Sequence, residues 1–456
     1  MHDTIRSWFS LALPLLLVGG LAALAWITRP LAELPAGREE VVFWHFWGGA
    51  DRKVVEEIVD RFNDSQQKYF VRAVAMPGNN LDMKMFLAVS GGDPPDLVNQ
   101  DDPIVADWAH RGALIPLDEI APAEEIAELE NWLLPAARQL GTYQGQLYGL
   151  CNGLDIRALY YNRRVIQERT GKAAPESLES IDQLDELADA CVERKNGRLT
   201  SLGYLPDPRR LWSWGVVFGG RFIDPASGQV TPHDPAIVRA LEWMVSYRDK
   251  WGADTLAAFR QGDQSLPGTT FPLLSGRYAI IMDGQWRVRD IPKSRSGDFG
   301  VWRLPPPAGS SRQADGWVNG NLFLVPRGCR TPRGAWEFMK FWSGFGGHEA
   351  EAARACSKGG WIPPSQQVID QPRFQQYLQQ NPLFGRFVEL AAGKQVPTPV
   401  IPGARMYDRE VITAAQRALY TDSPDDAASL LQATAIKVQQ HVDRVRKKTG
   451  AQGGNR

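Results

Sequence analysis

The chain has 456 residues, which is too many for a single hydrophobic core, so we expect at least two domains or lobes. It is 43% hydrophobic and 23% charged, as globular proteins are, and its net charge of -1 excludes the basic footprint of a nucleic-acid-binding protein. The histidines are scattered and the cysteines show no C-x-x-C spacing, which argues against a metal site. Their spacing leaves open whether the four thiols are free or form a disulfide: Cys151, Cys191, Cys329 and Cys356.

An uncharged apolar run near the N-terminus, residues 8–27, is long enough to span a bilayer. It is either a secretory signal cleaved after residues 23–25 or a retained transmembrane anchor, and we favour the anchor because the run is long for a signal core. Both interpretations place the rest of the chain outside the cytoplasm, in the periplasm or on the outer face of the cytoplasmic membrane. Residues 31–40 are expected to form a linker.

The first segment after the linker alternates predicted strands and helices. Strands are expected at residues 41–44, 70–75 and 96–98, with amphipathic helices at 51–62 and 81–90 between them. This order predicts a parallel sheet with right-handed crossovers, and ligands of such sheets bind beyond the carboxyl ends of the strands. The residues at those ends therefore become candidate ligand contacts: His45, Trp47, Asn99 and Asp101.

A polar strand follows about a third of the way along the chain. Residues 143–149 predict a strand pair with a glycine turn, residues 151–153 interrupt it, and a strand is expected at 154–161. Asp155 and Arg157 lie on one face of that strand, against an apolar opposite face. A polar strand that joins two α/β segments is expected of a hinge, where a ligand between lobes would be touched. The alternative is an ion pair between the two residues across the hinge.

The second half of the chain predicts further helices and strands. Helices are expected at residues 178–193, 235–250, 332–344 and 424–447, and strands at 278–283, 299–304 and 322–326, with a loose tail at 449–456. The aromatic segment 211–220 is interpreted as strand-like. Of its two tryptophans, Trp212 and Trp214, we expect one to belong to the core, and we favour Trp212 for a site.

Several motifs together resemble a known family. The pattern YG-x3-G-x-D-x-R-A-L-Y-Y-N, which begins at Tyr148, resembles the middle signature of bacterial extracellular solute-binding proteins of family 1, the sugar receptors of ABC importers of the maltose and glycerol-phosphate receptor type. Other motifs similar to that family occur in order from about residue 41 to 445: VVFWHFWGG, SGGDPPDLV, LWSWGVVFGG, G-Q-W at Gly284 and GGWIPP at Gly359.

The resemblance implies a two-lobed α/β periplasmic-binding-protein fold of type II, with several crossovers at the hinge. Residues 1–37 would be the signal or transmembrane helix and linker. Lobe 1 would comprise residues 38–152 and 315–375, lobe 2 would comprise 153–314 and 376–448, and 449–456 would be a disordered tail. Further crossings are implied at residues 316–321 and 397–407.

A sugar presents apolar C–H faces and a ring of hydroxyls, so its site needs aromatic faces and side chains that exchange two hydrogen bonds each. The resemblance carries over three ligand contacts, Asp155, Trp286 and Tyr407, of which Trp286 is the best stacking candidate. Positional candidates complete the set: Arg157, Trp317, Asn319 and Arg405. Cys151-Asn152 before the hinge acid and Trp361 depart from the family pattern, which puts the substrate in doubt.

The leading hypothesis is a monomeric, non-catalytic receptor without cofactor that closes on a sugar or oligosaccharide and docks on a membrane permease. The alternative is a receptor of the same fold for another polar solute. Arg157 and Arg405 are compatible with a glycerol phosphodiester as that solute. A polyamine would require a ring of acidic residues, which the sequence does not show. A secreted carbohydrate-active enzyme would need two opposed carboxylates, such as Asp155 and Asp283, but no catalytic motif supports it. Presentation of the ligand to a sensor rather than a permease also stays open.

Overall fold

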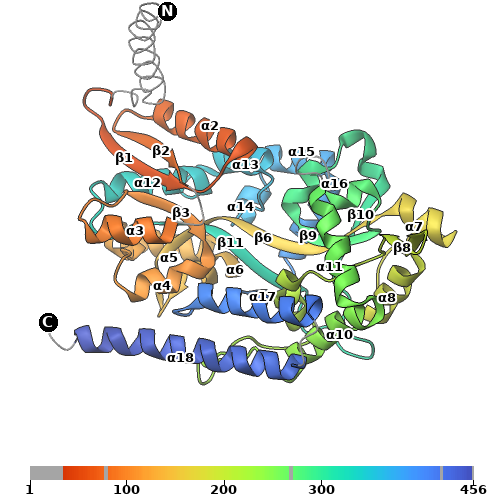
Figure 1. Cartoon of the computed structure of the whole chain (residues 1–456). Helices are drawn as coiled ribbons and strands as arrows, with labels where there is room; N and C mark the ends of the chain where they lie inside the picture. Colours follow the sequence, from red (N-terminus) through yellow and green to blue (C-terminus); the bar gives the residue numbers. More distant parts are fainter. Residues whose placement is uncertain (1–33, 77–80, 266–270, 422–424, 454–456) are drawn as a thin grey trace, which may run out of the picture.

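One long strand, β6 (Gly149–Asn162), runs through the centre of the molecule and belongs to the sheets of both halves (Figure 1). The computed structural model describes residues 34–76, 81–265, 271–421 and 425–453. The first half of β6 pairs antiparallel with β11 (Gly316–Leu324), and its second half pairs antiparallel with β9 (Ile280–Gly284) and β10 (Phe299–Trp302). The sheet order is therefore β10-β6-β11-β3-β1-β2, with β9 also on β6 and β12 (Gln395–Pro397) on β11.

The first half of the molecule is built on the predicted parallel unit. β1 (Glu39–His45) pairs parallel with both β2 (Tyr69–Ala75) and β3 (Leu97–Asp101), and the crossovers contain α2 (Gly49–Ser65) and α3 (Leu81–Ser90). Along β1, Val41 and Phe43 are buried whereas Trp44 is only half-buried, the alternation expected of a strand. Phe43 packs edge-on against Phe338 of α12 (Pro332–Ser343), with ring centroids 5.5 Å apart. This confirms the predicted βαβαβ order.

The same half contains further helices, and a hairpin leads into β6. Gln144 and Gly145, both with positive φ, make the tight turn between β4 (Thr142–Tyr143) and β5 (Gln146–Leu147), which confirms the predicted strand pair. The helices of this region and of the returning chain are α4 (Val105–His110), α5 (Ala123–Trp132), α6 (Pro135–Gly141), α13 (Glu349–Gly359), α14 (Gln366–Ile369) and α15 (Pro372–Gln380). The next helix, α16 (Pro382–Ala391), packs against β10 and the end of β6 in the second half.

The second half surrounds β9, β10 and the end of β6 (Figure 1). Tyr161 of β6 stacks on Trp302 of β10 at 3.6 Å between ring centroids, which seals the core under this part of the sheet. The elements here are α7 (Arg163–Thr170), α8 (Ile181–Ala190), β7 (Glu193–Lys195), β8 (Arg198–Ser201), α9 (Leu211–Val217), α10 (Pro235–Trp251) and α11 (Ala253–Gln261).

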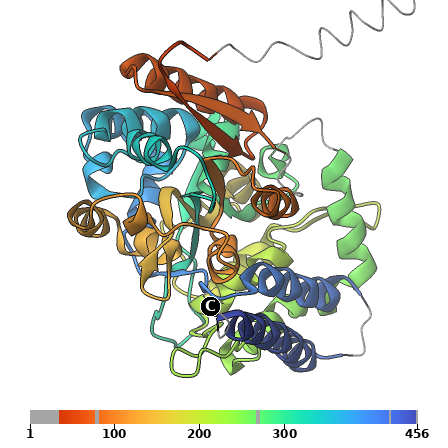
Figure 2. The same cartoon turned by 90° about the vertical axis from the view of Figure 1, so that its left-hand side faces the viewer.

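The C-terminal helices α17 (Ala404–Tyr420) and α18 (Ala427–Gly453) lie side by side below the central sheet (Figures 1 and 2). α17 contacts α9 and α10 of the second half and the short 3-10 helix η2 (Asp102–Ile104) of the first half. It therefore contacts both halves beside the crossing strands. α18 continues to Gly453, beyond the predicted end at residue 447, so the predicted loose tail begins as helix.

Two local predictions differ from the structure. Residues 211–217 form the helix α9 and not a strand, because they are all buried and leave no alternation with solvent to read. Residues 151–153 do not end β6, which runs through them, but the predicted irregularity is there: Gly153 pairs with Asn321 and Cys151 with Leu322, so Asn152 is the extra residue of a β-bulge.

The predicted anchor at residues 8–27 lies outside the described residues. Within the part of the chain that the structure describes, no helix is both long and apolar enough to cross a membrane. Among the four cysteines, all in described segments and all free thiols, only Cys329 is partly exposed. The lobe boundaries at residues 152, 314 and 375 stay a prediction.

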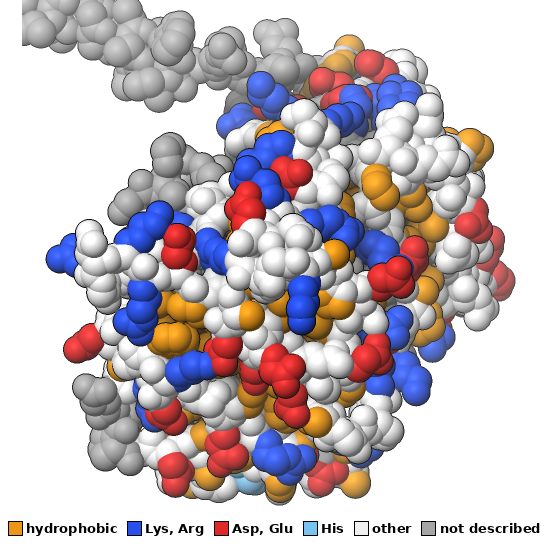
Figure 3. Space-filling view, turned by 90° about the vertical axis from the view of Figure 1, so that its right-hand side faces the viewer, with side chains coloured by type: hydrophobic (Ala, Val, Ile, Leu, Met, Phe, Trp, Pro, Cys, Tyr) orange, Lys and Arg blue, Asp and Glu red, His pale blue; other side chains and the backbone are white. Residues whose placement is uncertain are grey.

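The surface is mixed in charge. Figure 3 shows lysine and arginine interspersed with aspartate and glutamate over one face, with separate hydrophobic areas between them. This agrees with the near-zero net charge and gives this face no single electrostatic sign.

Candidate functional site

The polar side chains of the crossing strands lie together where β6 and β11 run between the two halves. Asp155 of β6 lies directly opposite Asn319 of β11, and Arg157 lies two residues further along the same face. The Arg157 Nη1 group donates to the side-chain oxygen of Asn319 and, at 3.0 Å, to the backbone oxygen of Asp155. The carboxylate of Asp155 accepts from Gln285 Nε2 at 2.7 Å. The acid and the base thus share a face as predicted, but each is held by an amide side chain.

Two tryptophans flank the Arg157 guanidinium. Its central carbon lies 5.1 Å from the ring centroid of Trp286 and 4.6 Å from that of Trp317, within the range of a cation–π contact. Burial lowers the pKa of Arg157 to about 10, so the group stays charged at neutral pH and keeps both contacts. Trp317 is buried, whereas Trp286 is half-buried and still accessible. Arg157 therefore fixes a partly exposed indole at the crossing.

The sequence Gly284-Gln285-Trp286 explains how that indole is positioned. Gln285 binds the backbone of β6 in both directions, since its Oε1 accepts from Ile156 N at 3.1 Å and its Nε2 donates to Leu154 O at 3.1 Å. Gly284 ends β9, and a Cβ added there would overlap the six-membered ring of Trp286. Glycine is needed for the ring to fold back over the strand end. The glutamine anchors the turn, and the tryptophan is presented beside β6.

Carboxyl groups from the first half approach the same face. Asp101, at the end of β3, accepts from Asn321 Nδ2 at 2.7 Å, and Asp102 accepts from the backbone N–H of Gly320 at 2.9 Å. Burial, reinforced by the neighbouring Asp155, raises the pKa of Asp101 to about 6. Burial also raises the pKa of Asp102 to about 7, against the opposing hydrogen bond from Gly320. Both acids thus titrate near physiological pH.

Helix α17 covers the site from a third direction. Arg405 pairs with Asp82 of α3 at 2.8 Å, which links α17 to the first half of the molecule. One turn later, burial raises the pKa of Asp408, while the Trp212 indole, Arg157 and Arg405 act in the opposite direction. Trp212 thus lies close enough to Asp408 to act on its pKa. The two groups are not aligned for a hydrogen bond, however, and the buried Trp212 Nε1 has no partner among the described residues.

An aromatic cavity of about 390 Å³ adjoins the polar face. Trp212 of α9 and Trp317 of β11 line it with their rings 6.0 Å apart and nearly parallel, and the wall also includes Phe222 and Pro397. Trp317 Nε1 donates to Thr398 at 3.0 Å, so its ring is fixed in place. Trp317 thereby contacts both the polar face, through Arg157, and the cavity.

The structure brings together most of the predicted site residues and separates the others. Contacts or electrostatic coupling at the crossing join seven of them: Asp101, Asp155, Arg157, Trp286, Trp317, Asn319 and Arg405. Trp212 joins this group through Trp317. Asn319 lies inside β11 and reaches the site from there.

His45 and Trp47 are not placed to contact a ligand. His45 is buried, between Phe43 and Trp47 at 5.4 and 5.9 Å, and burial lowers its pKa to about 4. Trp47 is buried against Trp342 of α12, with nearly parallel rings 5.4 Å apart. Both continue the inward side of β1, so the period-2 alternation that buries Phe43 buries them too.

Asn99 and Tyr407, also predicted as ligand contacts, are likewise not placed to contact a ligand. Asn99 is fully buried and donates to Asn152 at 2.8 Å, which links β3 to β6 inside the molecule. Tyr407 is fully buried, donates to the backbone oxygen of Phe222 at 2.6 Å and packs edge-on against Trp212. On a helix, the residue that follows an inward tyrosine turns by about 100°, which places Asp408 and not Tyr407 toward the crossing.

Four residues of the site were missed: Asp82, Gln285, Asn321 and Asp408. Gln285 and Asn321 stand within motifs that the sequence does mark, beside Trp286 and two residues after Asn319. In the first loop, Trp44 and Phe46 are half-buried whereas the predicted His45 and Trp47 are buried. The alternation of β1 could have indicated this, because it places residues 44 and 46 on the face opposite to Phe43. No sequence motif marks Asp82 or Asp408 as a site residue. Each lies near the start of a helix, and only the packing of that helix on the sheet brings it to the site.

Comparison with known proteins gives consistent matches. Residues 57–382 match the protein family described as bacterial extracellular solute-binding protein. A maltotriose-binding protein of Pyrococcus abyssi is 21% identical over 342 residues, which cover 75% of this chain and 70% of that protein.

Solved structures agree with the fold. The structure of CpMnBP1 with mannotriose bound shares 24% identity and a TM-score of 0.73, covering 88% of this chain and 99% of that one. The sugar-binding protein MalE of Xanthomonas citri shares 18% identity and a TM-score of 0.70, covering 92% of this chain and 100% of that one. The two-lobed α/β fold expected from the sequence is therefore confirmed.

The buried acid at the crossing makes a prediction about stability. Because the pKa of Asp102 is raised in the fold, the folded chain holds a proton that the unfolded chain releases near pH 4, so stability falls as the pH rises from about 4 through about 7. Asp102→Asn keeps the acceptor for Gly320 N and removes the charge. We expect its thermal midpoint to exceed the unmodified chain's by about 2–5 °C at pH 8 and to match it at pH 4.

Calorimetric melting over pH 4–8 measures this difference. Asp118→Asn, at an exposed aspartate of the same half, serves as the matched control and should leave the profile unchanged. A midpoint lowered equally at both ends of the pH range would show that Asp102 is ionised and stabilising in the fold.

Proposed function

The chain belongs to the bacterial extracellular solute-binding protein family, and from this premise we propose that it is the substrate-binding receptor of an ABC importer. In this proposal it captures a sugar or oligosaccharide between its lobes and delivers it to a membrane permease. The family is extracellular, which supports export of residues beyond the apolar N-terminal run. Anchoring by residues 8–27 is part of the same proposal and rests on the sequence alone.

One observation carries the proposal: Trp286 is half-buried and still accessible at the crossing of the lobes, among amides and carboxylates. An indole offers a flat apolar surface to the C–H face of a sugar ring. Asp101, Asp155 and Asn321 lie around the same crossing and can exchange hydrogen bonds with hydroxyls. The maltotriose-binding protein and the mannotriose complex among the similar proteins support an oligosaccharide as the ligand.

Binding without catalysis fits the carboxylates of the site. Glycoside hydrolysis uses two carboxyl groups on opposite sides of the bond that is cleaved. Asp155 is engaged by Gln285, and Asp283 accepts from both Arg210 and Arg287, so both acids have protein partners. The family consists of binding proteins, which supports the same conclusion.

Lobe closure supplies the coupling to transport. β6 and β11 cross between the halves, and residues 397–407 are a further crossing in this proposal. A hinge at such crossings allows the lobes to move as bodies. A ligand that touches Asp101 on one side and Trp286 on the other gains both sets of contacts only in the closed form. Its affinity difference between the two forms then drives closure, and the closed form is the one that docks on the permease.

Replacing the stacking residue tests this proposal. We expect Trp286→Ala to weaken oligosaccharide binding by about 30-fold or more, because a central aromatic anchor typically supplies at least about 2 kcal/mol. Isothermal titration calorimetry of the full-length chain in mild detergent, against maltotriose, mannotriose and a galactose trisaccharide, measures the effect.

Trp251→Ala is the matched control. Trp251 is also half-buried and also lies beside cations, Arg194 and Lys250, each 5.3 Å from its ring, but it ends α10 away from the crossing. Its replacement should leave affinity unchanged. Equal losses in both variants would contradict a role for Trp286 in the site, and a steady shift in baseline power would mean turnover instead of binding.

The glycine before this turn makes a second test. Gly284→Ala should displace the Trp286 ring and lower affinity by about tenfold while the protein stays folded, because the backbone there has φ of -88°, which alanine adopts without strain. Calorimetry gives the affinity and circular dichroism the folded state. Unchanged affinity with alanine at this position would show that the position of the indole does not matter for the ligand.

A further inference from the structure

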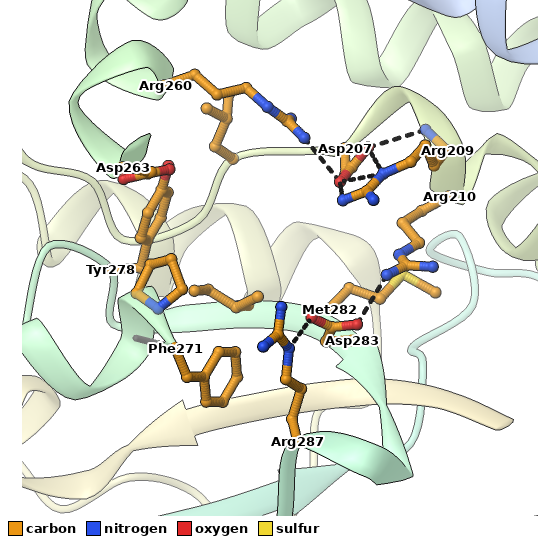
Figure 4. Close-up of a pocket in the computed structure, with 13 residues that line it drawn as sticks. Asp207, Arg209, Arg210, Arg260, Asp263, Phe271, Tyr278, Met282, Asp283 and Arg287 are labelled. Carbon is orange, nitrogen blue, oxygen red and sulfur yellow. Dashed lines mark hydrogen bonds and ion pairs between the residues drawn. The ribbon is translucent and has the colours of Figure 1, made fainter. Parts of the chain in front are cut away.

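A separate cavity of about 280 Å³ lies beside β9 (Figure 4). Its wall comes from the 3-10 helix η4 (Pro208–Arg210), from α11, from β9 and from the 3-10 helix η7 (Gln285–Asp290). Four arginines line it: Arg209, Arg210, Arg260 and Arg287. Ligand pockets usually measure about 300–1,000 Å³, so this one suits a single unit of a ligand and not a whole oligosaccharide.

Two carboxylates of this arginine pocket, Asp207 and Asp283, are each shared between two arginines. Asp207 accepts from Arg209 at 2.6 Å and from Arg260 at 2.8 Å (Figure 4). Burial favours the neutral acid, yet the arginines around Asp207 hold its pKa well below the usual range. The surroundings of this carboxylate are therefore strongly positive.

The second shared carboxylate repeats the pattern. Asp283 accepts from Arg210 at 2.8 Å and from Arg287 at 2.9 Å, so each of the two carboxylates faces two guanidinium groups (Figure 4). Asp290, which is not part of the pocket wall, accepts a hydrogen bond from Arg287 Nη1 at 2.8 Å. The third lining carboxylate, Asp263, is already bound by Arg277 at 3.0 Å and by the Tyr278 hydroxyl at 2.6 Å.

One guanidinium is left incompletely paired. Arg210 is only 6% exposed, and its Nε–H has no acceptor among the described residues. A buried donor without a partner costs free energy, and for a charged group the cost is larger. Carboxylate, sulfate and phosphate oxygens fit guanidinium groups better than neutral acceptors do, since the hydrogen bonds are charge-assisted.

The arginine pocket shares a wall with the candidate site. β9 provides Asp283 to the pocket and leads directly into Gly284 and Trp286. Asp283 lies opposite Ala158 on β6, beside Arg157. Burial raises the pKa of Asp155 and lowers that of Arg157, and the charge of Arg210 acts on both in the lowering direction, so it also reaches the site. The arginine pocket and the candidate site are therefore neighbours along β9 and the turn that follows it.

We propose that the arginine pocket binds an anionic group carried by the same ligand, so that the cargo is an acidic carbohydrate with a carboxylate, sulfate or phosphate ester. This inference rests on the proposed receptor function and names its substrate class. The shared Asp207 and Asp283 hold the four guanidinium groups in place before the ligand arrives, which reduces the ordering cost of binding. Phe271 lies 5.3 Å from the Arg287 guanidinium and supplies an apolar floor.

Paired ligands, one with and one without an anionic group on the same sugar, test the proposal on the full-length chain by calorimetry. The pairs are trigalacturonate with its full methyl ester, glucose 6-sulfate with glucose, and glucose 6-phosphate with glucose. The acidic member of at least one pair should bind about tenfold tighter or more, and which pair responds identifies the anionic group.

Substitutions tie that preference to the pocket. In Arg209→Gln and Arg287→Gln, whose side chains are 57% and 29% exposed, the ratio of acidic to neutral affinity should fall toward one. Arg164→Gln, at a surface arginine of α7 that is 60% exposed and pairs with Glu168, should leave the ratio unchanged. Raising the salt concentration should lower the same ratio in the unmodified chain.

The outcomes separate this inference from the function it rests on. Equal or tighter binding of every neutral member, or a ratio that neither pocket substitution changes, overturns the acidic-ligand proposal and leaves the sugar receptor standing. Silence across all five compounds of the three pairs, together with the neutral oligosaccharides, overturns the receptor function itself and this inference with it.

Discussion

The antiparallel pairing of β6 with β11 is the constraint on which the rest of the structure depends. A single strand of 14 residues supplies backbone partners to β11 in the first half and to β9 and β10 in the second. Its apolar face is buried on both sides of the crossing, so the opposite face, with Asp155 and Arg157, must lie between the halves. The polar site is thus a consequence of how the two sheets are joined.

Charged groups in such a place are costly unless they have partners, and the chain supplies most of these with amides and aromatic rings. The Nε–H of Arg157 is the exception, since it has no acceptor among the described residues. Arg157 uses Asn319 and two indoles, and Asp155 uses Gln285. Because these partners fix both charges without neutralising them, the site remains polar and ordered before a ligand enters. The neighbouring arginine pocket follows the same logic, with guanidinium groups held in place by shared carboxylates.

Much of the fold could be predicted, because strand alternation and the order of elements are local in the sequence. The crossing strand, the parallel unit around β1 and the Gly-Gln-Trp turn follow from such patterns. The rest depends on packing between distant segments. Nothing near Tyr407 in the sequence indicates that Phe222 buries it, and the aromatic run of α9 has no polar face by which its helix could be recognised. The arginine pocket could not be predicted from the sequence either, since its residues come from separate segments of the chain.

Hydrogen–deuterium exchange with and without a saturating oligosaccharide tests most directly whether the ligand binds at the crossing. The account predicts slower exchange in residues 284–288 of the second half and in residues 99–103 of the first, because a ligand between the lobes covers both. Protection confined to residues 219–223 and 395–399 would place the ligand in the aromatic cavity instead and would contradict the crossing as the site.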